Sequence, residues 1–157
     1  MGCISTVDLQ TKMDIQELLS RFCHFLDHNN ATEWARLFTA DCRLDCGSMG
    51  RFDGRAAISA IPALVQAKGS GTLRHHLSNV MLDRTGNARE LEMHAYCLVT
   101  DWSRQGAMVA CFDFHARLQN RCHWQVAELS MNPVGACDGG HVDMALTDKI
   151  APGMMLN

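Results

Sequence analysis

The chain has 157 residues, with 14 lysines and arginines against 17 aspartates and glutamates, so its net charge is −3 when histidine is neutral. Its length suits one domain, and 47% apolar with 20% charged residues can form a buried core, which excludes a disordered chain. No basic block suggests nucleic acid as a partner, and no apolar run approaches the roughly 18 residues of a membrane span. We expect one soluble domain over residues 1–157, with a core at about 10–132, a tail or flap at 133–157 and no signal peptide.

The first half of the chain is predicted to be mainly helical. An amphipathic helix is expected over residues 11–27, because apolar residues recur there at the spacing of one helical face. Asn29 and Asn30 should end it, since asparagine tolerates the left-handed geometry of helix ends. Thr32 should cap a second helix over 33–39. A strand over 41–45, a glycine-rich turn and a third helix over 55–67, kinked or broken at Pro62, should follow.

The second half of the chain changes to the two-residue period of β-strands. Four strands are expected over residues 72–83, 90–102, 107–119 and 123–132, with turn residues between them. Strands joined in order by short turns pair antiparallel. Helices followed by such a meander predict an α+β fold, with the helices packed on one side of a curved antiparallel sheet. Such a cone should have a mostly apolar pocket with a few polar groups at its open end.

The eight cysteines contain no CxxC pair, the spacing that zinc knuckles usually need. Several lie in apolar periodic segments, where a free cysteine behaves as a small hydrophobic residue. We therefore expect reduced thiols and a cytoplasmic protein.

Candidate chemistry begins with Asp27 and the histidine pair His75 and His76. Asp27 lies at the edge of the apolar helix face. It is either a functional carboxylate or an ordinary residue at the helix end, where its charge is unfavourable against the helix dipole. Strand alternation places His75 on one face with Asn79 and Met81, and His76 on the other. Only one histidine can face the pocket, and either could be an ordinary hydrogen-bonded residue. A histidine with a carboxylate partner is a common general base at neutral pH.

His94 and Tyr96 share one face of the next strand, and His115 lies on a polar face of the strand after it, where a cross-strand ion pair is the simple explanation. A metal site built from histidines and aspartates stays open, although no HxH or HExxH spacing supports one. The sequence also lacks a phosphate-binding glycine loop and a GxSxG motif. We therefore expect no cofactor and no metal.

Several segments resemble SnoaL-like proteins of the nuclear-transport-factor-2-like superfamily, which are cone-shaped α+β barrels. They are DIQELL (14–19), FLD (25–27), WARLFTAD (34–41), FDGRAAI (52–58) and RHHLSN (74–79). The resemblance covers about residues 10–132. It implies the fold more strongly than a reaction, because the superfamily contains enzymes and non-enzymes.

Within this superfamily, scytalone dehydratase and hexachlorocyclohexane dehydrochlorinase pair an Asp late in the first helix with a strand His that acts as base. Asp27 matches the first position, and His75 matches the second because it lies four residues before Asn79. His94 resembles the second pocket histidine of the dehydratase.

The chain departs from both enzymes around this pair. The water-positioning tyrosines of the dehydratase correspond here to Leu26 and Cys46, and the cationic residues of the dehydrochlorinase correspond to Phe22 and Leu129. The resemblance therefore implies an acid–base pair in a more apolar pocket.

The sequence favours a cofactor-free lyase or isomerase acting on a small apolar organic molecule, such as a natural-product cyclase or dehydratase. His75 would be the base, Asp27 would hold it, and His94 or Tyr96 would stabilise charge on oxygen. We expect the substrate pocket to be lined by Tyr96, Asn79, Trp34, Cys46, Phe22 and Leu129. The alternative is a non-catalytic ligand-binding or scaffold subunit, which a pocket too shallow for a ligand would favour. Expected partners are a small-molecule substrate and further copies in a dimer or trimer, with no nucleic acid and no membrane.

Overall fold

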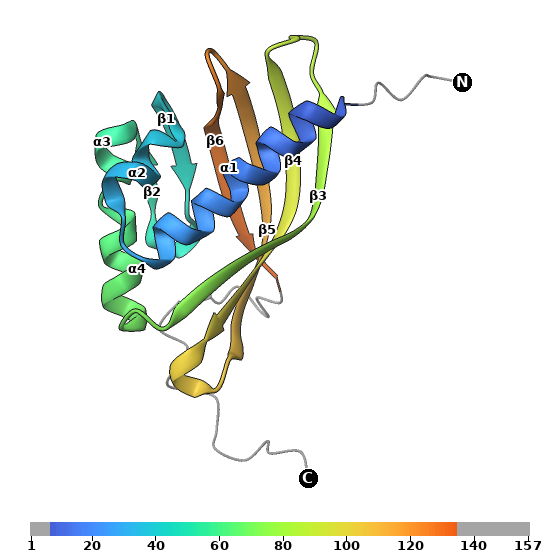
Figure 1. Cartoon of the computed structure of the whole chain (residues 1–157). Coiled ribbons are helices and arrows are strands. Elements are labelled where there is room, and N and C mark those ends of the chain that lie inside the picture. Colours follow the sequence, from blue (N-terminus) through green and yellow to red (C-terminus); the bar gives the residue numbers. More distant parts are fainter. Residues whose placement is uncertain (1–6, 135–157) are drawn as a thin grey trace.

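The computed structural model describes residues 7–134, in which helices cover one face of a six-stranded, strongly twisted sheet (Figure 1). The strand order is β2-β1-β6-β5-β4-β3. The predicted α+β class is confirmed. The sheet differs from the expected antiparallel one at a single place, because β1 and β6 pair in parallel.

Helix α1 (Leu9–Asp27) begins at Asp8, whose side chain accepts a hydrogen bond from the Thr11 backbone N–H at 2.9 Å. Its apolar face is buried, and Asn29 follows its end with a φ of 54°, as predicted. Helix α2 (Ala31–Arg36) is capped by Asn30, whose side chain accepts from the Glu33 N–H at 3.4 Å. The expected Thr32 cap is therefore wrong, because Asn30 caps the helix through the Glu33 N–H and Thr32 lies inside the helix.

Strand β1 (Phe38–Asp45) starts within the segment where the second helix was expected to continue. Phe38 pairs with Val126 of β6, and the Gln125 side chain donates to the Arg36 and Phe38 carbonyls at 2.9 and 3.0 Å. These bonds use backbone groups that a longer helix would need, so the helix stops at Arg36. The turn η1 (Gly47–Met49) leads into β2 (Arg51–Asp53), a strand that the sequence analysis missed.

The expected third helix is divided in two. Helix α3 (Arg55–Ile58) is followed by α4 (Ile61–Gly69), and Pro62 lies in the first turn of α4. Proline is accepted there because it lacks the N–H that a first helical turn leaves unbonded. The predicted break is confirmed, but it lies at residues 59–60, just before Pro62.

The four predicted long strands are present as β3 (Leu73–Arg84), β4 (Glu90–Asp101), β5 (Ala107–Asn120) and β6 (Trp124–Pro133), with the short helix η2 (Trp102–Arg104) after β4. Residues of β4 alternate between a buried inner face, packed against the helices, and an outer face. The core therefore lies between the inner face of the sheet and α1, α2 and α4 (Figure 1).

Strand β3 contains a β-bulge that reverses its alternation. The register with β4 shifts between Ser78 and Met81, and Asn79 adopts a positive φ of 53°. Before the bulge, His75 and Leu77 face inward, but after it Val80 and Leu82 pack on the core and Met81 is 60% exposed. The expectation that Asn79 and Met81 share the face of His75 is therefore wrong.

Among residues 7–134 no helix is long and apolar enough to cross a membrane. The cysteines in this part of the chain are free thiols. Apart from Pro133 and Val134, the expected tail or flap lies outside the described residues.

The buried Asp101 side chain ties the end of β4 to the start of β3. Its Oδ1 atom accepts hydrogen bonds from the Thr72 hydroxyl at 2.8 Å, and from the Ser103 hydroxyl and N–H at 2.7 and 3.0 Å. Hydrogen bonds from Ser103 and Thr72 hold the pKa of Asp101 below its ordinary value. Because the folded pKa is depressed, this stabilisation is complete above the unfolded pKa and is lost as the pH falls through the folded pKa.

Asp101→Asn should therefore lower the free energy of unfolding by about 1 kcal/mol at neutral pH, since bonds to a charged acceptor are the stronger ones. The difference from the wild type should shrink as the pH falls below the ordinary aspartate pKa and through the lower pKa of the folded protein, where the wild-type carboxylate takes up a proton. Urea unfolding across this range measures it. The exposed Asp83→Asn is the control and should change stability little. A pH-independent deficit in the Asp101 variant would contradict the prediction.

Candidate active site

The candidate active site is a buried contact between the end of α1 and the start of β3. The Asp27 carboxylate accepts a hydrogen bond from the His75 backbone N–H at 3.0 Å through Oδ2, and its Oδ1 lies 2.6 Å from His75 Nδ1. Both side chains are buried, with 4% and 8% of their surface exposed. The two bonds together fix the position and the tilt of the imidazole ring.

Strand β3 makes this contact possible because it lies at the edge of the sheet. On an edge strand, alternate N–H groups point away from the neighbouring strand and need another acceptor. Asp27 supplies that acceptor at His75. The bonds also compensate a carboxylate that is buried and lies at the negative end of a helix dipole. The alternative of an exposed helix-end Asp27 is therefore excluded.

The contact resolves the choice between the two adjacent histidines. His75 lies on the inner face with Asp27, whereas His76 is exposed and its Nε2 lies 3.0 Å from the Thr100 hydroxyl. Strand alternation predicts this separation correctly, because the bulge comes only after Ser78.

His75 forms part of the wall of an apolar cavity between the sheet and the helices. Of the residues expected to line a pocket, Phe22, Trp34, Cys46 and Leu129 do line it. The wall is completed by Leu26, Leu44, Met49, Ile61, Val65, Cys97, Phe112, Phe114 and Met131. Because Nδ1 faces Asp27, Nε2 on the opposite side of the ring is the nitrogen that is free to act on a bound molecule.

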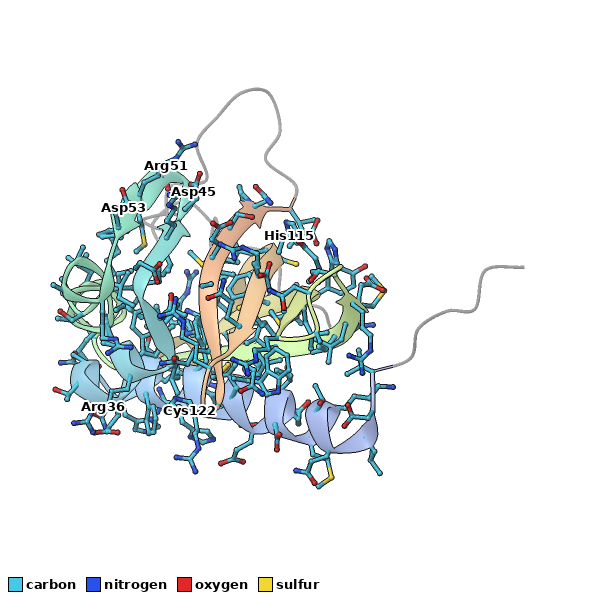
Figure 2. The ribbon with its side chains drawn as sticks, turned by 90° about the horizontal axis from the view of Figure 1, so that it is seen from above. Arg36, Asp45, Arg51, Asp53, His115 and Cys122 are labelled. Atoms are coloured by element: carbon cyan, nitrogen blue, oxygen red, sulfur yellow. The ribbon has the colours of Figure 1, made fainter. Side chains whose placement is uncertain are left out.

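The free volume of this cavity is only about 30 Å³, roughly the space of a single water molecule. A larger open groove of about 870 Å³ lies on the outer face of the sheet, where Asp45, Arg51, Asp53 and His115 all point away from α1 (Figure 2). The groove is charged and is not next to the Asp27–His75 pair. A substrate at His75 therefore requires some side chains of the cavity wall to move.

The structure does not place His94, Tyr96 and Asn79 in this cavity. His94 and Tyr96 alternate with the buried Met93 and Cys97, so they lie on the outer face, where Tyr96 is 52% exposed. Asn79 is turned outward by the bulge. The expectation that these three residues share a pocket with His75 is therefore wrong, because they line a separate open groove of about 530 Å³ on the outer face.

Trp34 carries a polar group that the sequence analysis overlooked. Its ring is 1% exposed and lines the cavity, and within residues 7–134 its indole N–H has no hydrogen-bond partner. A buried donor without an acceptor costs free energy, so it would gain from an acceptor on a bound molecule. Amphipathic spacing identifies the apolar ring but not the unpaired N–H.

Buried thiols surround the acid–base pair and stay protonated. Burial, and then the charge of Asp27, raise the pKa of Cys23 to about 12. Burial, and then the charge of Asp45, raise the pKa of Cys46 to about 12, and burial raises that of Cys97 as well. These cysteines are therefore neutral parts of the wall and not nucleophiles.

Comparison with known proteins gives one family and a shared fold. The pattern of the SnoaL-like domain matches residues 7–129. No curated protein matches the chain. A nuclear-transport-factor-2-like protein from Novosphingobium aromaticivorans has a similar structure, with a TM-score of 0.73, 17% identity, and 82% of this chain and 84% of that chain covered.

Two further solved structures from the same organism carry the names of enzymes. A candidate scytalone dehydratase has a TM-score of 0.69 and 18% identity over 83% of this chain and 97% of that chain. A candidate aromatic ring hydroxylase has a TM-score of 0.66 and 16% identity over 82% of this chain and 92% of that chain. At these identities the similarity shows the nuclear-transport-factor-2-like fold and no particular reaction.

The burial of the thiols predicts an order of reactivity. In the folded protein at about pH 8, iodoacetamide should modify the exposed Cys122 at least about tenfold faster than Cys23 or Cys46, whose thiolates are scarce and shielded. Peptide mapping by mass spectrometry measures each site. In denaturant the three rates should converge, and equal rates in the folded protein would contradict the geometry.

Proposed function

The chain belongs to the SnoaL-like domain family, and within it we propose that this protein is a lyase or isomerase that uses Asp27 and His75 as an acid–base pair on a small, largely apolar carbonyl compound. The observation that carries the proposal is the 2.6 Å contact between Asp27 Oδ1 and His75 Nδ1, with the imidazole in the cavity wall. Cyclisation and dehydration of a natural product are the reactions that fit best. The similarity to a candidate scytalone dehydratase is compatible with this choice.

The Asp27 carboxylate determines which nitrogen of His75 is the base. It accepts a hydrogen bond from Nδ1–H, so the free lone pair of the ring is on Nε2. The carboxylate also stabilises the imidazolium that forms when Nε2 takes a proton. Nε2 would remove a proton from the carbon next to a carbonyl group. The C–H electron pair then forms the enolate, and the imidazolium returns its proton to a leaving hydroxyl or to another carbon.

Trp34 offers a donor for the oxygen of the enolate. With His94 and Tyr96 on the outer face, the unpaired indole N–H at the cavity wall takes the role that those residues were expected to have. In an apolar site that excludes water, a fixed donor of this kind strongly stabilises developing negative charge. Apart from His75, the walls offer mainly apolar contacts, which suits an apolar substrate.

Entry of the substrate would depend on the two methionines of the cavity wall. Met49 on η1 and Met131 on β6 are both partly buried, and methionine side chains adapt readily to a new neighbour. Their displacement would enlarge a cavity of about 30 Å³ without breaking the Asp27–His75 contact.

The small volume also supports a second candidate function. A cavity that stays closed would make the chain a non-catalytic scaffold or ligand-binding subunit. The expected dimer or trimer stays a prediction under both functions, because the structure describes one chain.

Hydrogen–deuterium exchange separates the two functions without knowledge of the natural substrate. The wild-type protein, incubated in deuterium oxide with tetralones and cyclohexenones, should accelerate exchange next to the carbonyl, as followed by proton NMR. His75→Ala should lose about 10²–10⁴-fold of this acceleration. Asp27→Asn should lose most of it, and the double variant should be little worse than either, because the residues act as a unit.

The matched control is His76→Ala, which removes the neighbouring exposed histidine and should keep the exchange rate per folded molecule. Circular dichroism and urea unfolding establish that each variant folds. If the folded His75 and Asp27 variants exchange as fast as the wild type, the acid–base assignment is wrong. If the wild type accelerates no exchange with any of these ketones, the scaffold function is favoured.

Trp34→Phe tests the donor. It keeps an aromatic ring but removes the N–H, so kcat for exchange should fall about tenfold or more while KM changes little. Trp124→Phe, at a buried tryptophan outside the cavity wall, is the control and should keep both constants. An unchanged kcat in a folded Trp34→Phe protein would exclude the donor role of Trp34. The acid–base pair is tested separately, by the His75 and Asp27 variants.

A further inference from the structure

Three potential metal ligands meet on the outer face of the sheet, opposite the candidate active site. They are Glu92 and His94 on β4 and His115 on β5, and their ligand atoms all lie within 4.8 Å of one another. Figure 2 shows His115 on the side of the sheet away from α1. None of the three belongs to the apolar cavity.

The strand register brings these side chains together. His94 lies directly opposite His115, and Glu92 is two residues from His94 on the same face of β4. The two imidazole rings stack with centroids 4.5 Å apart and planes at 11°. His115 Nε2 is also hydrogen-bonded to the Glu92 carboxylate. A cross-strand ion pair accounts for His115 and Glu92, but it leaves the stacked His94 without a function.

We propose that Glu92, His94 and His115 form a binding site for a divalent transition metal ion, with zinc as the best fit. Two imidazoles and one carboxylate are a known zinc ligand set, and they leave a fourth position for water or a ligand. Bonds of about 2.0–2.2 Å require the ligand atoms to approach to roughly 3.5 Å of each other. Since the side chains of His115 and Glu92 are 49% and 38% exposed, rotation can supply this closure.

The charges around the site favour a cation. The groove that includes Glu92 and His115 is lined by five carboxylates (Asp41, Asp45, Asp53, Glu92, Glu128) and three guanidinium groups (Arg43, Arg51, Arg117), which leaves two negative charges in excess with histidine neutral.

Arg117, which lies two residues from His115 on β5, is already paired. Its Nη2 donates to Glu128 at 2.7 Å, and its Nη1 lies 3.4 Å from Glu90. Asp113, on the other side of His115 along β5, pairs in register with Tyr96 and adds a further negative charge to this face. The repulsion between Arg117 and a cation bound at the three ligands is therefore partly cancelled by these carboxylates.

The proposed site is independent of the proposed reaction. The ligands lie on the outer face and Asp27 and His75 on the inner face, with the sheet between them. A metal ion with an open position could bind an anionic group or organise the groove, while the acid–base pair acts on the opposite side.

Isothermal titration of the full chain with zinc chloride tests the site. We expect one zinc ion whose binding is lost in His94→Ala and in His115→Ala, each of which should weaken affinity by more than about tenfold. Cobalt chloride, added to the metal-free protein, should give a visible absorption spectrum that both variants lose.

The matched control is the double variant His24→Ala/His28→Ala. It removes another stacked histidine pair, at the C-terminal end of α1, whose ring centroids are 6.1 Å apart. This double variant should bind zinc as the wild type does. The proposal is overturned if the wild type binds no zinc, or if binding survives in folded His94→Ala and His115→Ala proteins. Loss of binding in the His24/His28 variant would also overturn it.

Discussion

The double contact between Asp27 and His75 determines how the helical layer meets the sheet. A buried carboxylate needs compensating hydrogen bonds, and His75 on the edge strand β3 supplies two of them, through its backbone N–H and its ring. The end of α1 must therefore lie beside the start of β3. That position sets α1 across the inner face of the sheet (Figure 1). It also places the apolar cavity beside the imidazole.

Strand alternation then divides the sheet into two chemically different surfaces. Along β4, the buried Met93 and Ala95 face the helices, and the residues that alternate with them, Glu92 and His94, face outward. The inner surface keeps one titratable histidine in an apolar wall, which favours proton transfer. The outer surface gathers charges and imidazoles in a polar groove, which favours ions. The two faces of one sheet thus carry the two proposed sites, without contact between them.

Local periodicity predicted the elements whose stability is local or repetitive: α1, the break near Pro62 and the four long strands. It failed where distant residues decide. The sequence around Phe38 predicts a helix, but Phe38 pairs with Val126 in the sheet. The bulge at Asn79 changes the strand alternation, and a single asparagine is its only signal in the sequence. The Asp27–His75 pairing came from family resemblance, because spacing alone left Asp27 and both histidines open. The same resemblance suggested a pocket role for His94. Strand alternation predicts the opposite, because His94 is next to the buried Met93 and so faces outward.

The choice between catalyst and scaffold depends less on the acid–base pair than on the cavity. A basic imidazole gains reactivity when water is excluded, and the apolar wall provides this. The same close packing leaves about 30 Å³, so binding must be coupled to movement of the wall. The rings of Phe22 and Trp34 pack with their centroids 5.4 Å apart and resist displacement. Met49 and Met131 have flexible side chains. The free energy needed to displace these two methionines therefore sets whether a substrate can reach His75.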